Sequence, residues 1–263
     1  MARYHTIHTR QADGVQTITL NRPEKRNALS AVVIQELTEA LEAAAECKCG
    51  VLILTGAGSA FCAGLDLEHL ESMTAKTPEE HRKDSESVAK LLRTLYDFPK
   101  PTIAAVNGAA IAGGMGIATI CDFTLAVPEA KFGYTEVRIG FIPAIVSSFL
   151  LRQVGEKRAR DLLLTGRILK AAEALELGLL TRIVPEQDLM REANNLAQSL
   201  LRNSSASMTA IKRMLSGHAK ERLDREIEEA IEWNAKQRAT EDFKEGVRAF
   251  LEKRTPVWPS RGE

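Results

Sequence analysis

Two segments of the chain each join an apolar strand to a glycine-rich turn. The run VLILT at 51–55 is apolar almost throughout, as is typical of a strand covered on both faces, and GAGSAFCAGLDL follows it at 56–67. The apolar run at 101–106 is followed by NGAAIAGGMG at 107–116, which opens a helical run to about residue 121. Further apolar strands are expected at 123–127 and 180–184. This recurrence of strand, turn and helix predicts an α/β fold with parallel strands.

The two ends of the chain differ in their expected structure. The alternating run VQTITL at 15–20 predicts a strand, and Ser30 is a suitable N-cap for the helix that follows. From about residue 186 no strand is expected, and helices are predicted at 186–201, 205–216, 219–238 and 241–253. We therefore expect a core over residues 1–196 and a helical lid or oligomerisation region over residues 197–263.

Charge and hydropathy exclude several classes of partner. Lys plus Arg and Asp plus Glu each total 35, so the formal net charge is zero. The protein then has no global attraction to nucleic acid or to anionic membranes. No apolar stretch reaches membrane-spanning length, and the first residues lack the apolar run of a signal peptide. We expect a cytoplasmic protein without nucleic-acid or membrane partners.

The cysteines and histidines do not form a metal-binding pattern. Cys47 and Cys49 are separated by one residue, which is poor spacing for zinc, and no pair of histidines accompanies them. Cys62 and Cys121 lie in apolar surroundings. Four reduced structural thiols and no metal site are the prediction.

Each glycine-rich turn could serve one of several purposes. Glycine lets backbone approach a ligand closely, and a helix N-terminus carries about half a positive charge. A phosphate is disfavoured because the Walker lysine is missing, and a dinucleotide because neither turn has the complete glycine fingerprint. A developing oxyanion remains, as does a tight turn that needs glycine only for packing.

Several motifs taken together closely resemble the crotonase (enoyl-CoA hydratase/isomerase) superfamily. They are RPEKRNALS at 22–30, AFCAGLDL at 60–67, KPTIAAVNG at 100–108, AKFG at 130–133, GFIP at 140–143, LTGR at 164–167 and FLEKR at 250–254. They span nearly the whole chain in the family's order. The resemblance implies a superhelix of repeated ββα units, whose C-terminal helices build trimers that often pair into hexamers.

The resemblance also implies a substrate and a set of site residues. The substrate is an acyl-CoA, so coenzyme A arrives as part of it and no prosthetic group is expected. The family's oxyanion hole, two backbone N–H groups that hold the thioester oxygen, corresponds to Leu65 and Gly113. Coenzyme A contacts correspond to Lys25, Arg26, Ala28, Ala63, Asp66 and Leu67, and Phe250 and Lys253 correspond to groups that reach a neighbouring subunit's ligand.

The chain departs from the family pattern at one of the two catalytic acids. Family hydratases use two glutamates; the second is present as Glu136, but the first position is Gly116. We expect Glu68 or Glu71, in a long charged loop, to be able to replace the missing acid. An enoyl-CoA hydratase that converts 2-enoyl-CoA to 3-hydroxyacyl-CoA is the main prediction. A single-base isomerase of 3-enoyl-CoA and a non-catalytic acyl-CoA-binding trimer are the alternatives.

An apolar pocket is expected to hold the acyl tail of this substrate. The candidates for its lining are Met73, Ile139, Phe141 and Ile145.

Overall fold

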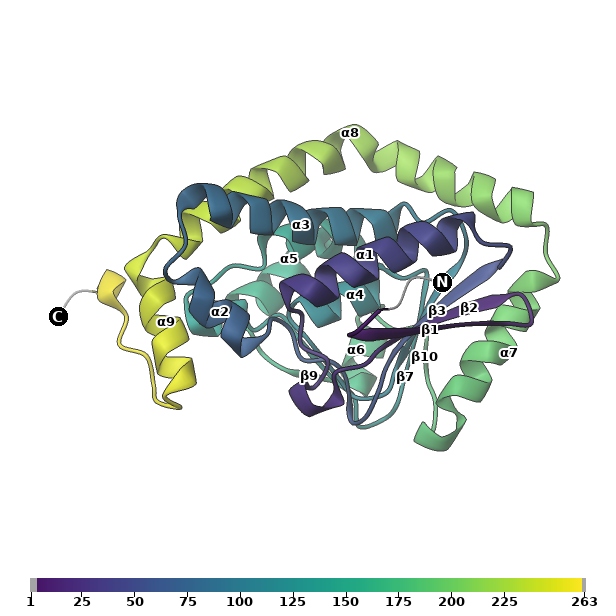
Figure 1. The fold of residues 1–263 in the computed structure, drawn as a ribbon, viewed down its shortest axis with the longest axis horizontal. Coiled ribbons are helices and arrows are strands. Elements are labelled where there is room, and N and C mark those ends of the chain that lie inside the picture. The colour runs from purple at the N-terminus through teal and green to yellow at the C-terminus, as the bar shows by residue number, and fades with distance from the viewer. Residues whose placement is uncertain (1–3, 262–263) are drawn as a thin grey trace.

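The strands form two sheets in a computed structural model that describes residues 4–261 (Figure 1). The larger sheet has the order β1-β2-β3-β5-β7-β10, in which β1 is antiparallel to β2 and the remaining pairs are parallel. The smaller sheet has the order β4-β6-β8-β9, and its last pair is antiparallel. The strands are β1 (Ile7–Ala12), β2 (Val15–Leu20), β3 (Val51–Gly56), β4 (Ala60–Cys62), β5 (Thr102–Val106), β6 (Ala109–Ile111), β7 (Phe123–Ala126), β8 (Lys131–Gly133), β9 (Leu169–Lys170) and β10 (Arg182–Ile183).

From β3 to β8, successive strands alternate between the two sheets, and each pair of strands then passes into a helix. β3 and β4 lead to α2 (Leu67–Met73) and α3 (Pro78–Tyr96), and β5 and β6 lead to α4 (Gly113–Ile120). β7 and β8 lead through the 3-10 helix η2 (Glu136–Ile139) to α5 (Ala144–Thr165). Because the first strand of each unit joins one sheet and the second joins the other, the units wind into the expected superhelix of ββα units, and the α/β prediction is confirmed.

The remaining helices surround this superhelix. They are α1 (Ala31–Glu46), α6 (Ala171–Glu176), α7 (Leu189–Leu201), α8 (Ser205–Arg238) and α9 (Glu241–Leu251), with 3-10 helices η1 (Pro23–Lys25), η3 (Glu186–Asp188) and η4 (Pro259–Arg261). Ser30 caps α1 as predicted, its side chain accepting a hydrogen bond from the Val33 N–H. α8 runs above α3 and contacts both α3 and α5 (Figure 1). No helix within residues 4–261 has the length and apolar character needed to cross a membrane.

The structure corrects the helix predictions in two places. The segment from 68 to 86, expected as a charged loop, consists of α2 and the first half of α3 with a turn at 74–77 between them. Pro78 stands at the start of α3, and Thr77 and Glu80 form a capping box. The two helices expected at 205–216 and 219–238 are one, because α8 continues through Gly217. Packing against α3 and α5 offsets the cost of about 1 kcal/mol that a mid-helix glycine brings.

The boundary expected between residues 196 and 197 falls inside α7. α7 packs on β3, β5 and β7, so the helical C-terminal region begins in contact with the main sheet. The division into two regions stays a prediction.

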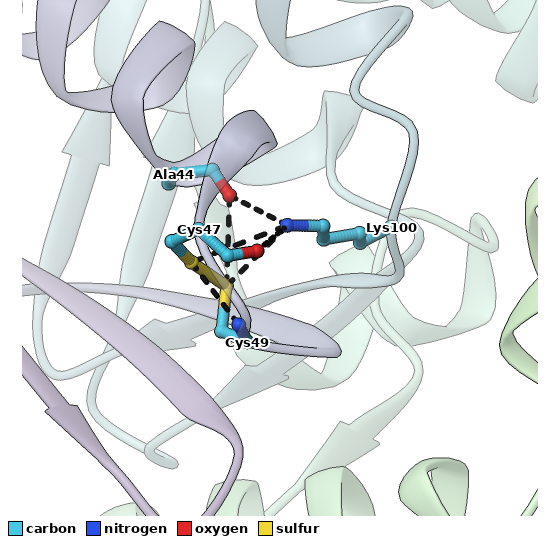
Figure 2. The surroundings of a disulfide bond; sticks show 4 residues. All are labelled: Ala44, Cys47, Cys49 and Lys100. Atoms are coloured by element: carbon cyan, nitrogen blue, oxygen red, sulfur yellow. Dashed lines mark hydrogen bonds between the residues drawn. A yellow bond between two sulfur atoms is a disulfide. The ribbon is translucent and has the colours of Figure 1, made fainter.

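The prediction of four reduced thiols is wrong for two of the cysteines. Cys47 and Cys49 form a disulfide, with their Cα atoms 5.4 Å apart, which lies in the usual range for such bonds. Figure 2 shows the Lys100 ammonium beside this disulfide, where it donates hydrogen bonds of 2.8 Å to the carbonyl oxygens of Ala44 and Cys47. The turn after α1 therefore brings the two sulfurs together, whereas Cys62 and Cys121 are free and buried. Among the described residues no cluster of His, Cys, Asp and Glu could hold a metal ion.

Gly217 and Gly246 are helical glycines with opposite surroundings, and they make a matched test of this packing. A Cβ on Gly217 would have no atom within 4 Å, whereas one on Gly246 would lie 2.3 Å from the Ile139 backbone. We expect Gly217→Ala to raise the free energy of unfolding by about 0.5–1 kcal/mol and Gly246→Ala to lower it. Urea denaturation of both variants checks this, and equal effects would contradict the packing described.

Candidate active site

A cavity of about 800 Å³ lies where the connections between the two sheets meet the C-terminal helices. Its wall includes η1, the turn after β4, the start of α4, η2 and the start of α5. The last turns of α8, together with α9 and the segment after it, complete the wall. Leu65, Gly113 and Glu136 all line this cavity, so the structure brings the three predicted catalytic positions together.

The backbone N–H groups of Leu65 and Gly113 are free for a ligand. Leu29 bridges the backbone on either side of Leu65: its N–H donates to the Gly64 carbonyl at 2.7 Å, and its carbonyl accepts from the Asp66 N–H at 3.0 Å. This pairing leaves the Leu65 N–H without an acceptor in residues 4–261. Gly113 is the first residue of α4, and the first N–H groups of a helix have no acceptor within it.

Two unusual backbone positions create this arrangement. Gly64 has φ +90°, a conformation that glycine adopts without strain. Ala112 has φ 52° and ψ −124°, which is strained for a residue with a Cβ. The strain turns the chain from β6 directly into α4, so that Gly113 begins the helix at the cavity wall.

Glu136 is a buried carboxyl group. It begins η2, its exposed fraction is 7%, and its Oε2 has no hydrogen-bond partner in residues 4–261. Burial disfavours the charged form and raises the pKa of Glu136 to about 8. At neutral pH the group can therefore both hold and release a proton, which general acid–base catalysis requires.

The described wall of the cavity holds no second carboxylate that is both buried and unpaired. A Cβ on Gly116 would lie 2.5 Å from Cγ1 of Val146, so the Val146 side chain occupies the space where a longer residue at Gly116 would begin. Of the other carboxylates in the described cavity wall, Glu24 is exposed and Asp66 forms an ion pair with Arg22 at 2.8 Å.

Neither of the two acids expected to replace the missing one reaches the cavity. Glu68 is exposed and pairs with Lys25 at 2.8 Å, and Glu71 is exposed on α2. Neither residue lines the cavity, so that expectation is wrong.

Most of the predicted coenzyme A contacts line the cavity, and the others do not. Phe250 lines the cavity of its own chain, Lys253 lies outside its wall, and Leu67 begins α2 with a side chain outside the described part of the structure. The residues of this set that line the cavity are Lys25, Arg26, Ala28, Ala63, Asp66 and Phe250.

A buried asparagine holds the mouth of the cavity in place. Asn27 has an exposed fraction of 1%; its Oδ1 accepts from the Arg22 N–H, and its Nδ2 donates to the carbonyls of Ala57 and Ala60. Arg22 in turn pairs with Asp66, whose side chain also caps α2. Asp66 therefore acts here through Arg22 and the helix N-terminus, which positions the residues around it.

The apolar part of the wall matches the expected acyl pocket at three of four positions. Ile139, Phe141 and Ile145 line the cavity, whereas Met73 is fully buried behind it in a cluster that includes Phe141. Sequence reasoning missed a further set of lining residues, which the folding of distant helices brings to the wall: Leu70, Val88, Arg138, Asn234, Arg238 and Arg254.

Comparison with known proteins assigns the chain to a family. Residues 10–261 match the family model described as enoyl-CoA hydratase/isomerase. A Thermus thermophilus protein whose name places it among the enoyl-CoA hydratases is 46% identical over 92% of this chain and 96% of its own. The 2,3-dehydroadipyl-CoA hydratase of Escherichia coli K12 is 35% identical over 94% and 96%.

Comparison with solved structures gives the same family. The crystal structure of an enoyl-CoA hydratase/isomerase from Xanthobacter autotrophicus Py2 superposes with a TM-score of 0.88 at 30% identity, covering 95% of this chain and 97% of that one. The chain therefore belongs to the enoyl-CoA hydratase/isomerase family.

Proposed function

We propose that this protein adds water to 2-enoyl-CoA thioesters to give 3-hydroxyacyl-CoA, with Glu136 as its acid and base. One observation carries the proposal: a buried carboxyl of raised pKa lines the same cavity as the free N–H groups of Leu65 and Gly113. The names of the curated relatives as enoyl-CoA hydratases support the choice of reaction.

The two N–H groups act on the thioester oxygen. Addition of water at C3 moves negative charge through C2 onto that oxygen, giving an enolate. Two preorganised donors stabilise this charge, and in comparable sites one donor contributes about 3–4 kcal/mol. Gly113 adds the partial positive charge of a helix N-terminus to its own hydrogen bond.

Glu136 then carries a single proton from one end of the double bond to the other. Ionised Glu136 takes a proton from water as the water oxygen bonds to C3. The resulting carboxylic acid gives that proton to C2, which collapses the enolate and restores the ionised group. The net change is the addition of one water, and no second carboxylate is required.

Isomerisation of 3-enoyl-CoA to 2-enoyl-CoA is the second candidate. The close contact between Gly116 and Val146 favours it, because this reaction also needs only one carboxylate. Glu136 would take a proton from C2 and return it at C4, with the same two N–H groups holding the enolate. A non-catalytic acyl-CoA-binding trimer is less well supported, since a buried, unpaired carboxyl has no use in such a protein.

We also propose that the nucleotide part of coenzyme A binds near Lys25, Arg26 and Ala28. Its adenine and pantetheine path would follow Ala63, Asp66 and Leu67, and Phe250 and Lys253 would reach the ligand of a neighbouring subunit. A homotrimer or hexamer is the proposed assembly. It is supported by an exposed apolar stripe on α8, formed by Ile211, Met214 and Leu215 at helical spacing.

Product analysis with crotonyl-CoA and 3-hexenoyl-CoA tests the proposed function. We expect 3-hydroxybutyryl-CoA from crotonyl-CoA, and Glu136→Gln should lower the rate about 10²–10⁴-fold because the amide transfers no proton. Formation of 2-hexenoyl-CoA without any hydroxyacyl product would replace hydration by isomerisation. An active Glu136→Gln variant would overturn the assignment of the base.

The pH dependence of kcat/KM provides a second test of Glu136. Only the ionised carboxyl can accept the first proton, and its pKa is about 8. Activity should therefore rise about tenfold per pH unit below that value and level off above it. The residual activity of Glu136→Gln should lack this rise, and a wild-type profile that falls as pH increases would contradict the mechanism.

The buried Glu136 carboxyl should make the stability of the protein depend on pH. The folded pKa of about 8 lies above the ordinary glutamate value of 4.5, so the folded state holds a proton that the unfolded state releases between these two pH values. Stability should thus fall as pH rises from about 4.5 to about 8. Glu136→Gln should be more stable than wild type by on the order of 4 kcal/mol at the upper end, and the gain should vanish at acidic pH. Urea denaturation across this range checks it, and a gain independent of pH would point to another cause.

A further inference from the structure

Two buried polar side chains of α8 face the cavity, and the proposed chemistry uses neither. Asn234 and Arg238 line the cavity with exposed fractions of 5% and 2%. Oδ1 of Asn234 and Nε of Arg238 form no hydrogen bond with any residue from 4 to 261. Because residues four apart lie on one face of a helix, the two side chains form one surface, here called the polar pair.

Two contacts connect the polar pair and its helix to the segment that carries Glu136. The Arg238 guanidinium lies over the Phe141 ring, 5.1 Å from its centroid, and the Phe141 N–H donates to the Glu136 carbonyl at 3.0 Å. Gln237 donates to the Gly140 carbonyl at 2.8 Å, which ties the end of α8 to the end of η2. The polar pair therefore reaches the cavity at the Phe141 ring, and the cavity wall also includes the apolar side chains of Leu70 and Val88.

The charge of Arg238 is already balanced within the protein. Its Nη1 pairs with Asp84 at 2.7 Å and donates to the His81 carbonyl at 3.1 Å. Burial alone would raise the pKa of Asp84, but the hydrogen bond from His69 and the charge of Arg238 lower it, so Asp84 stays ionised. An additional anion would therefore meet a pair without net charge, with Asp84 nearby.

The unpaired buried atoms of the polar pair include a donor, the Nε–H of Arg238, and an acceptor, Oδ1 of Asn234. A hydroxyl group can accept from the first and donate to the second. A carbonyl oxygen can accept from Nε and, with the Asn234 amide turned over, from Nδ2 as well. A methyl-ended chain would leave both groups buried without a partner, which destabilises the complex.

We propose that the polar pair recognises a neutral oxygen, a hydroxyl or carbonyl, carried by the acyl chain well beyond the double bond. The preferred substrates are then oxygenated enoyl-CoA thioesters rather than simple fatty acyl ones. This inference rests on the proposed function for its reaction, but it concerns a separate part of the cavity.

Matched thioesters test the inference. kcat/KM is measured for 2-hexenoyl-CoA and 2-octenoyl-CoA, and for the same chains ending in a hydroxyl or in a carboxylate. In the wild type we expect a hydroxyl-ended chain to exceed its methyl-ended match by roughly tenfold. Equal or better turnover of both methyl-ended chains, or a preference for the carboxylate, would overturn the proposal.

Variants of α8 assign any preference to its source. Asn234→Leu keeps the side-chain volume and removes the acceptor, and Arg238→Lys keeps the charge beside Asp84 and removes Nε. Each should bring the ratio of hydroxyl-ended to methyl-ended turnover close to one, whereas Glu229→Ala, at an exposed position of the same helix, should keep the wild-type ratio. A wild-type ratio in both cavity variants would refute the role of the polar pair, and having two variants protects the test against misfolding of one.

Binding without turnover separates this inference from the proposed function. Calorimetric titration compares hydroxyoctanoyl-CoA with octanoyl-CoA, which carry no double bond to hydrate. If the wild type converts no enoyl-CoA but binds the hydroxylated thioester roughly tenfold more tightly, the proposed reaction fails and the recognition stands. If it converts crotonyl-CoA but shows no such preference, the recognition fails alone.

Discussion

The site depends on a close approach between two turns that are distant in the sequence. A Cβ on Gly114 would lie 2.3 Å from the Cys62 carbonyl oxygen, so α4 can meet β4 only because residue 114 has no side chain. β4 and β6 pair beside this contact, with Cys62 opposite Ala110. The free N–H groups of Leu65 and Gly113 follow these strands by a few residues each. A side chain at residue 114 would therefore separate the two donors before it changed anything else.

The burial that disfavours ionised Glu136 is also what suits it to proton transfer. Nothing in the described structure hydrogen-bonds to its Oε2, and burial raises the pKa to about 8 although a backbone hydrogen bond lowers it. A basic partner would stabilise the carboxylate and lower its ability to take a proton. Burial of ionised Glu136 therefore lowers the stability of the folded protein. The strained backbone of Ala112, beside Gly113, lowers it as well. Both costs fall on residues that line the cavity.

Much of the fold, and the positions of Leu65, Gly113 and Glu136, could be predicted from the sequence because each depends on a short local segment. The apolar strands, the Ser30 cap and the two glycine-rich turns each depend on local spacing. The Thr77–Glu80 capping box was equally local and was overlooked among the charges around it. The expected break between residues 216 and 219 is absent, because packing of α8 on α3 and α5 outweighs the low helix propensity of Gly217. The Cys47–Cys49 disulfide depends on the turn after α1, which spacing alone does not define.

The part of the cavity wall that α8 contributes could not be predicted from local sequence. Asn234 and Arg238 look like ordinary residues of a charged helix until the fold places α8 against η2, roughly a hundred residues earlier in the chain. Likewise, Gly116 could be recognised as a missing acid, but only the contact with Val146 explains why the position stays small. The part of the cavity formed by Leu65, Gly113 and Glu136 is thus built from local motifs, whereas the part formed by α8 depends on long-range packing.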